Sequence, residues 1–472
     1  MENNIYENLY NQNILPKYGF TRDPDYDNFL VSQSIYPHQY SVTDRVSMVD
    51  INVFSIDPPG CKDADDAFSI FYKKDKLFLA IHIADPTEYI NLESQLWQDI
   101  QNKVITHYPS NKEPIHLMPD QIIKLASLTV ENDSNTELKN AISIITEIDK
   151  NTYLPINNIK LEFTKITVSK DFTFNYNTAP DDLDEIKLGL KISKALHNLR
   201  SSKTIGAKLS DINNIYPIFD NNNIILNLDS DKVIALKQMI AEFAIFANSF
   251  VGEYLKLNLD GMGIFRTCDG QSIMYTGSNM TGQDLLNEII NQGISAEYIS
   301  TIKPHDLVGT PVYCHFTSPI RRLADCICHY LLKSMKLSMP IPWTRNDLEL
   351  IANRCYTVTK KERSIQYNDN KFRLIQLIDS LVNNNIIKVG FRITSYTGMF
   401  LNCIINKLYI NDDEYDIQLS YTLRILNKIV KDNIDFETFT SIVLVTKVNP
   451  YIRFDEGTIL DLDNFIKTNI FV

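Results

Sequence analysis

The feature that most constrains this chain is a short acidic connector, residues 57–66, placed between two runs with the pattern of β-strands. An apolar run, 51–56, leads into the connector, and an alternating run, 67–72, leads out of it. The Pro-Pro-Gly sequence at 58–60 forces a bend, because proline fixes φ and glycine accepts positive φ. The bend should bring together the four carboxylates of Asp57, Asp63, Asp65 and Asp66.

Four neighbouring carboxylates repel one another, and the repulsion is costly unless a cation neutralises it. Oxygen ligands at this density suit Mg²⁺ or Mn²⁺. A solvated acidic loop is the alternative, and the apolar strands on both sides argue against it. A calcium loop fails by position, because counting from Asp63 puts its required Gly on Phe68 and its closing Glu on Lys74. The spacing therefore favours a magnesium-type site.

Composition limits the class of protein. A net charge of −12 over 472 residues argues against a protein that coats nucleic acid, although it allows an enzyme with a local basic channel. The seven cysteines form no CxxC pair, so we expect reduced thiols and an intracellular, cytoplasmic location. We find no apolar run long enough to cross a bilayer and no start like that of a signal peptide, so no membrane partner is expected.

The periodicity predicts an α+β chain in three parts. Residues 1–45 have no sustained period and are expected to form an extended arm on the body. Residues 46–382 form the large mixed part, and residues 386–472 a small β-rich domain for which an OB-type barrel is the candidate fold. Strands in this last part are predicted at 387–395, 400–405, 414–419 and 441–448.

Within the large part, two apolar runs at 140–149 and 158–168 predict a strand pair. Residues 231–257 predict a long helix with a buried apolar stripe, and Glu242 lies at the edge of that stripe. This carboxylate either faces water or reaches into a site. Further helices are predicted at 181–202, 281–292, 323–336 and 348–382.

The sequence His-Phe-Thr-Ser-Pro-Ile-Arg-Arg at 315–322 precedes one of these helices. Ser318 is a natural N-cap and Pro319 suits the first helical position, which would place Arg321 and Arg322 in the first turn. The helix dipole disfavours cations there. Two arginines at this position therefore suggest that an anion is bound there jointly by the helix N-terminus and a guanidinium. The alternative is an ordinary ion pair with an acidic neighbour.

Five separated stretches resemble the RNase II (RNB) exoribonuclease family, and they occur in the family's order. The resemblance covers about residues 46–381 and implies a mixed α/β catalytic domain whose deep central channel admits single-stranded RNA. Where family members carry OB-type domains before the catalytic domain, we expect only the short arm. The five stretches are 53–67, 81–85, the segments 108–109, 117–119 and 126–128 taken together, 239–248, and 315–322 with Ala324, Asp325 and His329.

The resemblance implies Mg²⁺-dependent 3′–5′ hydrolysis of RNA to nucleoside 5′-monophosphates by a monomer. Asp57, Asp63 and Asp66 would hold the metal. Asp65 would orient the metal or the attacking water, and Arg321 would stabilise the charge of the scissile phosphate.

The resemblance also implies contacts to the RNA. Tyr108 would stack on a base near the 3′ end, a contact that tolerates any sequence. Glu242 would help to fix the terminal nucleotide, Arg322 would contact the RNA beside Arg321, and Tyr216 is the candidate for a second stacking ring.

Two alternatives from other classes stay open. The first is a relative that binds RNA or acts as a scaffold without activity, and the second is a nuclease that acts on DNA, which a pocket that senses the 2′-OH would exclude. The four aspartates and Arg321 favour an enzyme, because an inactive relative has no reason to keep four repelling carboxylates together.

Overall fold

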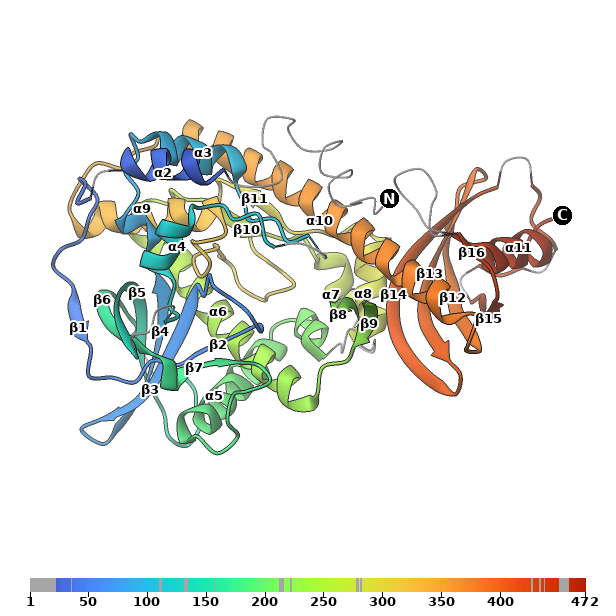
Figure 1. Cartoon of the computed structure of the whole chain (residues 1–472), viewed down its shortest axis with the longest axis horizontal. Coiled ribbons are helices and arrows are strands. Elements are labelled where there is room, and N and C mark those ends of the chain that lie inside the picture. Colours follow the sequence, from blue (N-terminus) through green and yellow to red (C-terminus); the bar gives the residue numbers. More distant parts are fainter. Residues whose placement is uncertain are drawn as a thin grey trace.

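A computed structural model of the chain describes residues 23–34, 36–109, 113–130, 135–156, 158–211, 216–220, 223–276, 280, 282–425, 428–432, 434–436, 438–449 and 458–472. A large lobe of mixed helices and sheets and a smaller β-rich lobe lie at opposite ends of the molecule (Figure 1). The helix α10 (Arg345–Leu381) runs from one lobe to the other. The mixed α+β architecture that the sequence predicted is confirmed.

The large lobe is built on one sheet with the strand order β1-β6-β5-β4-β3. Neighbouring strands are antiparallel except β1 and β6, which run parallel. The predicted strand pair is confirmed as β5 against β6. The five strands are β1 (Val46–Met48), β3 (Asp66–Lys73), β4 (Lys76–Ala84), β5 (Thr136–Ile148) and β6 (Lys160–Ser169).

Strand β4 is almost entirely apolar because it is buried on both faces. Its one histidine, His82, is fully buried and contacts the hydroxyl oxygens of Ser69, at 3.0 Å, and Ser143, at 2.7 Å. Burial lowers the pKa of His82 to about 3. His82 is therefore a hydrogen-bonded residue of the core.

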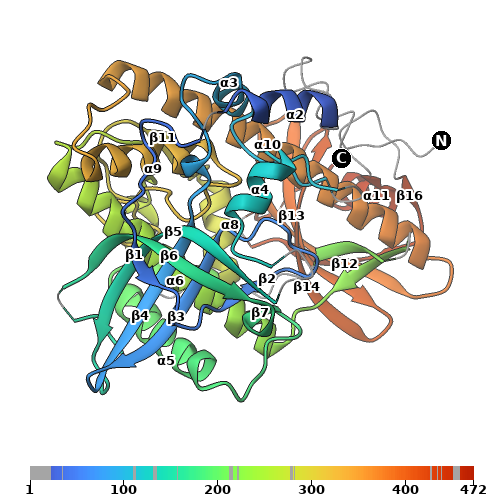
Figure 2. The same cartoon turned by 60° about the vertical axis from the view of Figure 1, so that its left-hand side comes forward.

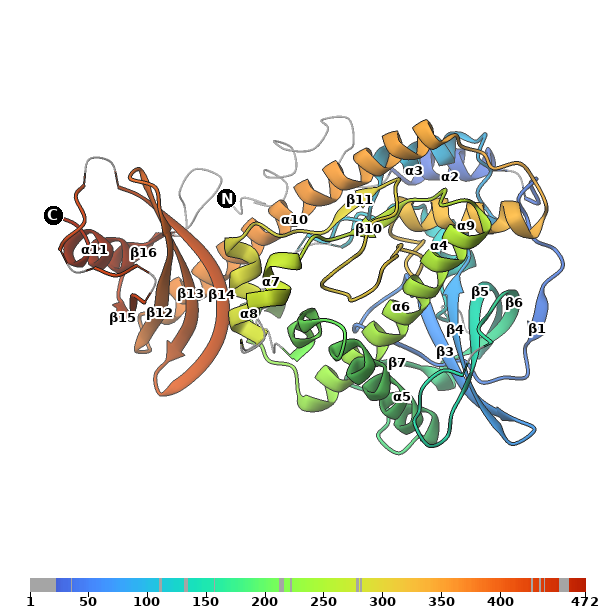
Figure 3. The ribbon, with the colours of Figure 1, turned by 180° about the vertical axis from the view of Figure 1, so that it is seen from behind.

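Helices α5 (Asp184–Ser201) and α6 (Asp231–Asn258) cover one face of this sheet (Figure 3). Phe243 of α6 packs on Phe68 of β3 with ring centroids 5.6 Å apart. Gly189 lets α5 approach α6 closely, because a Cβ there would lie 2.7 Å from the sulfur of Met239. By length and composition alone α6 could span a membrane, although no such run was expected from the sequence. In this fold its apolar stripe packs inside the lobe.

Helices α2 (Pro24–Ser32), α3 (Gln95–Lys103) and α9 (Leu323–Lys336) lie together beside the first half of α10 (Figures 1 and 3). Helix α2 corrects the prediction of an extended arm over residues 1–45. Asp23 caps it by accepting a hydrogen bond from the Asp25 N–H, and a proline occupies its first position, signals that we did not use. Residues 1–22 of the predicted arm lie outside the described ranges.

The small lobe contains a four-stranded antiparallel sheet in the order β14-β13-β12-β15, with helix α11 (Leu460–Asn469) packed on it. In the part of the chain that the structure describes, this sheet is open, so the predicted OB-type barrel is not seen. The strands are β12 (Ile387–Tyr396), β13 (Phe400–Ile410), β14 (Asp413–Arg424) and β15 (Thr440–Val445).

Helix α10 belongs to both lobes. Its first half buries Leu348, Ala352 and Cys355 in the large core, and its last turns bury Leu374 and Ile378 in the small core. The two cores therefore adjoin within one helix, upstream of residue 382, where the sequence predicted the large part to end.

Short elements complete the fold (Figure 2). They are β2 (Ser55–Asp57), α4 (Asp120–Ala126), β7 (Thr173–Asn175), β8 (Tyr216–Asp220), β9 (Asn223–Asn227), β10 (Phe265–Thr267), α7 (Gln271–Thr276), α8 (Gly282–Asn291), β11 (Glu297–Ile299), β16 (Val448–Asn449) and β17 (Thr458–Ile459), with 3₁₀ turns at Pro86–Glu88, Lys170–Phe172 and Ile205–Asp211.

Candidate active site

The acidic connector bends as the sequence predicted. Strand β2 ends at Asp57, and a turn follows in which the Cys61 N–H donates to the Pro58 carbonyl at 3.1 Å. Gly60 has a φ of +80°, a conformation that other residues adopt at a cost. Strand β3 then begins at Asp66. The two ends of the connector are thereby brought to the same side of the sheet.

A cavity of about 610 Å³ opens at this connector. All four aspartates line it, and Arg321 and Tyr108 join them from segments far away in the sequence. The structure thus places together six of the residues to which the sequence assigned metal binding, catalysis or base stacking. Other residues of the wall are Lys62, Glu113, His116, Tyr176 and Ile240.

Asp65 is the buried anchor of the site. One of its oxygens accepts the Ile320 N–H at 2.7 Å, and the other accepts the Arg321 Nε–H at 2.9 Å. Burial raises the pKa of Asp65, and the Arg321 guanidinium and the Ile320 N–H oppose that rise. Since both oxygens are taken by protein donors, Asp65 fixes Arg321 in place.

Arg321 is held at a second point, because its Nη2 donates to the Ser318 hydroxyl at 2.9 Å. Its side chain is nevertheless 44% exposed, so part of the guanidinium faces the cavity. A guanidinium that is oriented at one edge and open at the other is suited to bind an anion.

Asp57 and Asp66 carry charges that the fold does not compensate fully. Burial, and then the charge of Asp66, raise the pKa of Asp57 to about 7, even though the Ser55 hydroxyl donates a hydrogen bond to Asp57. Burial raises the pKa of Asp66 to about 6. Such a pair should attract a cation, which would restore both carboxylates to their charged form.

Asp63 is in a different state from its neighbours. Burial alone would raise its pKa, but the hydrogen bond and charge of His116, 3.5 Å away, lower it overall. The Tyr108 hydroxyl donates to the same carboxylate at 3.3 Å. Asp63 therefore stays ionised and ties the tyrosine to the connector.

The donor set suits a hard divalent cation, because Asp57, Asp63 and Asp66 offer only oxygen atoms in one cavity. Among the described residues, however, no three His, Cys, Asp or Glu side chains already converge in the arrangement of a bound metal. The oxygen ligands fit the chemistry of the ion. The three carboxylates would have to move closer together when the ion binds.

The segment before α9 differs from the prediction. Helix α9 begins at Leu323 with Arg322 at its N-cap, so Ser318 caps nothing and the two arginines precede the helix. Ser318 instead donates its N–H to Asp325 at 2.8 Å, which folds the segment back over the first turn. The helix-dipole argument for an anion site was therefore wrong.

The two arginines have separate roles. Arg321 enters the cavity, whereas Arg322 forms two hydrogen bonds with Asp325, at 2.8 and 2.9 Å. The ion-pair alternative thus holds for Arg322. Arg322 is not among the residues that line the cavity, so its contact with RNA stays a prediction.

Glu242 lies away from the four aspartates. It is buried, accepts hydrogen bonds from Arg200, and lies 3.0 Å from Nδ1 of His197. Glu242 and Arg200 line a separate small pocket of about 170 Å³ that Lys203 also lines. The RNA contact predicted for Glu242 stays a prediction. For Tyr216 only the backbone, at the start of β8, is within the described structure, so its proposed stacking role cannot be placed.

Two residues of the site were missed from the sequence. His116 directly precedes a segment that resembled the RNA-contacting part of the family, and its neighbourhood could have indicated it. Tyr176 gave no signal, because it reaches the cavity through the parallel pairing of β7 with β2, and short parallel pairs leave no local pattern.

The RNB domain family matches residues 45–337, which include the connector, Tyr108 and Arg321. The exosome complex exonuclease dis3 of Schizosaccharomyces pombe is 25% identical over 364 residues, covering 66% of this chain and 36% of dis3. Exoribonuclease 2 of Buchnera aphidicola is 24% identical over 375 residues, covering 68% of this chain and 56% of the relative.

Solved structures share the fold. Mycoplasma genitalium RNase R, in complex with ribose-methylated single-stranded RNA, superposes with a TM-score of 0.66 at 19% identity, covering 89% of this chain and 75% of that one. Yeast Ssd1, described as a pseudonuclease, superposes with a TM-score of 0.63 at 16% identity, covering 85% of this chain and 54% of Ssd1.

The chain spans between about a third and just over half of the length of the curated relatives named above. The match to the RNB domain nevertheless covers more than half of this chain and contains every residue that meets in the acidic cavity. On these grounds the chain belongs to the RNB family.

Proposed function

We propose that this chain is an exoribonuclease that depends on a divalent metal and degrades single-stranded RNA from the 3′ end to nucleoside 5′-monophosphates. The observation that carries the proposal is the meeting of four aspartates and one partly exposed guanidinium in a single cavity. The names of the relatives, an exosome exonuclease and an exoribonuclease, support the same reaction class.

The side chains that line the cavity would have separate roles in the reaction. Asp57, Asp63 and Asp66 would hold Mg²⁺ or Mn²⁺, which when bound supplies charge neutralisation and an activated water. Asp65 holds Arg321, whose free edge would bind the phosphate and stabilise the charge that develops on it. Tyr108 is 39% exposed at the cavity, and its ring would stack on a base without regard to sequence.

The second candidate is an RNB relative that binds RNA without cleaving it. The likeness to Ssd1 and the lack of three convergent metal ligands among the described residues are compatible with this candidate. Against it stands the Asp65–Arg321 pair, which presents a cation beside three further carboxylates that a scaffold would not need.

One assay separates these candidates. RNA and DNA single strands labelled at the 5′ end are incubated with the wild type and with Asp65→Asn, in Mg²⁺ or in EDTA. We expect stepwise shortening of RNA that requires Mg²⁺ and is lost in the variant. Binding of RNA without shortening by the wild type would favour the scaffold, and equal shortening of DNA would favour a nuclease without 2′-OH selectivity. Cleavage that persists in Asp65→Asn would reject the site.

A further inference from the structure

Helix α9 is buried on every side from Leu323 to Ser334, yet it carries a row of charged and polar residues along one side. Asp325, His329 and Lys333 follow one another at intervals of four, so they lie on the same side of the helix. All three are fully buried. A buried helix face normally consists of apolar residues, so this row needs a separate explanation.

The start of the row holds the segment that carries Arg321. Asp325 accepts the Ser318 N–H at 2.8 Å, and Nε2 of His329 lies 3.0 Å from the Phe316 carbonyl oxygen. In addition, the Cys326 thiol donates to the Pro319 carbonyl at 3.0 Å. The segment is thus hydrogen-bonded to the helix at three points.

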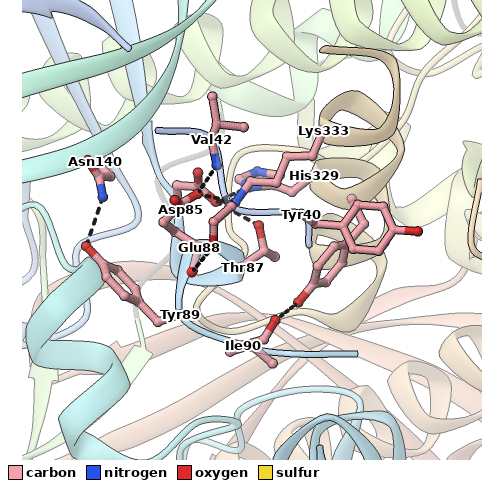
Figure 4. Close-up of polar contacts among 12 residues, drawn as sticks. Tyr40, Val42, Asp85, Thr87, Glu88, Tyr89, Ile90, Asn140, His329 and Lys333 are labelled. Carbon is pink, nitrogen blue, oxygen red and sulfur yellow. Dashed lines mark hydrogen bonds and ion pairs between the residues drawn. The ribbon is translucent and has the colours of Figure 1, made fainter. Parts of the chain in front are cut away.

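The end of the row enters a buried charge cluster (Figure 4). Nζ of Lys333 lies 3.0 Å from Asp85 and 2.8 Å from Glu88, and the Arg45 guanidinium lies 2.6 Å from both carboxylates. His329 is beside the cluster, with Nδ1 3.8 Å from Asp85. Two cations balance two carboxylates, and Lys333 and Arg45 hold the pKa of Asp85 well below its usual range against the effect of burial.

The same cluster reaches the other partner of the catalytic pair. Asp85 directly follows Ala84, the last residue of β4, and the Ala84 N–H donates to the Asp65 carbonyl at 2.8 Å. Asp65 is thus fixed to the end of β4, and Arg321 is fixed to α9. The contact of Lys333 with Asp85 and Glu88 joins these two elements.

We propose that His329 and Lys333 are positioning residues that set the place of Arg321 opposite Asp65, an inference that rests on the proposed nuclease function. An apolar contact between α9 and β4 would stabilise the fold as well or better, but it would lack the fixed hydrogen-bond directions that specify the register of the helix. Charged groups with fixed hydrogen-bond directions allow one register. Because Ser318 and Phe316 are hydrogen-bonded to α9, a shift of the helix would move this segment and the Arg321 guanidinium that it carries.

The test separates positioning from stability. Lys333→Met leaves the two buried carboxylates, Asp85 and Glu88, with Arg45 as their one cation, and it should lower both the melting temperature and kcat. Adding Glu88→Gln restores the charge balance, and the amide oxygen that replaces the carboxylate can still accept the Val42 N–H. We expect the double variant to regain most of the melting temperature, to bind RNA as the wild type does, and to keep a kcat reduced about 10²-fold, the usual effect of a shift of about 1 Å.

His329→Phe provides an independent variant that keeps the ring packed on Phe316 and removes the nitrogen near its carbonyl. It should lower kcat and leave RNA binding unchanged. Ile327→Val, elsewhere on α9, is the matched control and should leave kcat unchanged. If kcat recovers together with the melting temperature in the Lys333→Met/Glu88→Gln protein, the row serves stability alone and the inference is wrong.

If the wild type has no nuclease activity, the proposed function is rejected, and the positioning role is then tested by a crystal structure. In a crystal structure of the double variant, we expect Arg321 Nε to have left hydrogen-bond distance of Asp65. An unchanged Arg321–Asp65 contact would overturn the positioning role whatever the activity.

Discussion

The Nε of Arg321 lies 2.9 Å from the Asp65 carboxylate, although 256 residues separate them in the chain. The contact brings the end of the acidic connector to the segment before α9, so two motifs become one site. Each partner can be altered without changing the size of its side chain by much.

Asp65→Asn should abolish most of the activity without unfolding the protein. The amide keeps an acceptor for the Ile320 N–H but loses the charge that orients Arg321. By comparison with the loss of other preorganised electrostatic groups, we expect kcat to fall about 10²- to 10³-fold. Single-turnover RNA cleavage measures the effect, and binding of the same RNA in EDTA is the control. A variant that cleaves nearly as fast as the wild type would contradict this role.

Arg321 and Arg322 should respond differently to substitution. Arg321→Met should weaken cleavage, whereas Arg322→Met leaves the buried Asp325 without its cationic partner. The second variant should lose about 3 kcal/mol of unfolding free energy, as when one member of a buried pair is removed. Urea unfolding and RNA binding are measured for both variants, and RNA cleavage for Arg321→Met. Weaker RNA binding by a fully folded Arg322→Met would support the RNA contact predicted from the sequence, and unchanged binding would contradict it.

Tyr108 should contribute through its ring. Tyr108→Ala should cost about 1–3 kcal/mol of RNA binding free energy, the usual value for one base stacked on an aromatic ring. Tyr108→Phe keeps the ring and loses only the hydroxyl contact with Asp63, so it should bind nearly as the wild type does. Fluorescence anisotropy with a short labelled RNA measures both. Equal losses in the two variants would show that the hydroxyl, and not stacking, is what matters.

In the metal-free protein, Asp57 and Asp66 should contribute less stability as the pH rises from about 4 to about 7. The folded-state pKa of Asp57, about 7, and that of Asp66, about 6, both exceed the ordinary value. Each group therefore contributes stability that is complete below its unfolded pKa and is lost as the pH passes the folded pKa.

Melting temperatures in EDTA measure this effect as the difference between the wild type and Asp57→Asn, which removes the contribution of other groups. The melting temperature of Asp57→Asn should rise relative to that of the wild type as the pH rises. Mg²⁺ should raise the melting temperature of the wild type more above the folded pKa of Asp57 than below that of Asp66. A Mg²⁺ effect that does not depend on pH would speak against metal binding at these carboxylates.

The sequence predicted the parts of this site that depend on local pattern. The bend at residues 58–60 follows from proline and glycine geometry, and the strands on either side follow from their periodicity. The position of Arg321 could not be predicted this way, because Ser318 and Pro319 carry the local signals of a helix start. The Ile320 N–H, which a Ser318 cap would bind, donates instead to Asp65, and the Ser318 hydroxyl accepts from Arg321. Helix α9 accordingly begins only at Leu323.

Glu242 shows a second limit of sequence reasoning. Its place on α6 was predicted correctly, but its direction depends on Arg200 of α5, which accompanies it only in the folded chain. The open sheet of the small lobe was missed for a related reason. Strand patterns predict pairing, while closure of a barrel depends on the number and tilt of the strands.

Helix α10 has 37 residues, a length of about 55 Å at the usual rise per residue. Because one continuous hydrogen-bonded rod enters both cores, any tilt of the small lobe must turn the rod itself, and the large lobe with it. The two lobes are therefore expected to tumble together in solution. A cut between Cys355 and Leu374 would separate the helical turns that cover the large core from those that cover the small core.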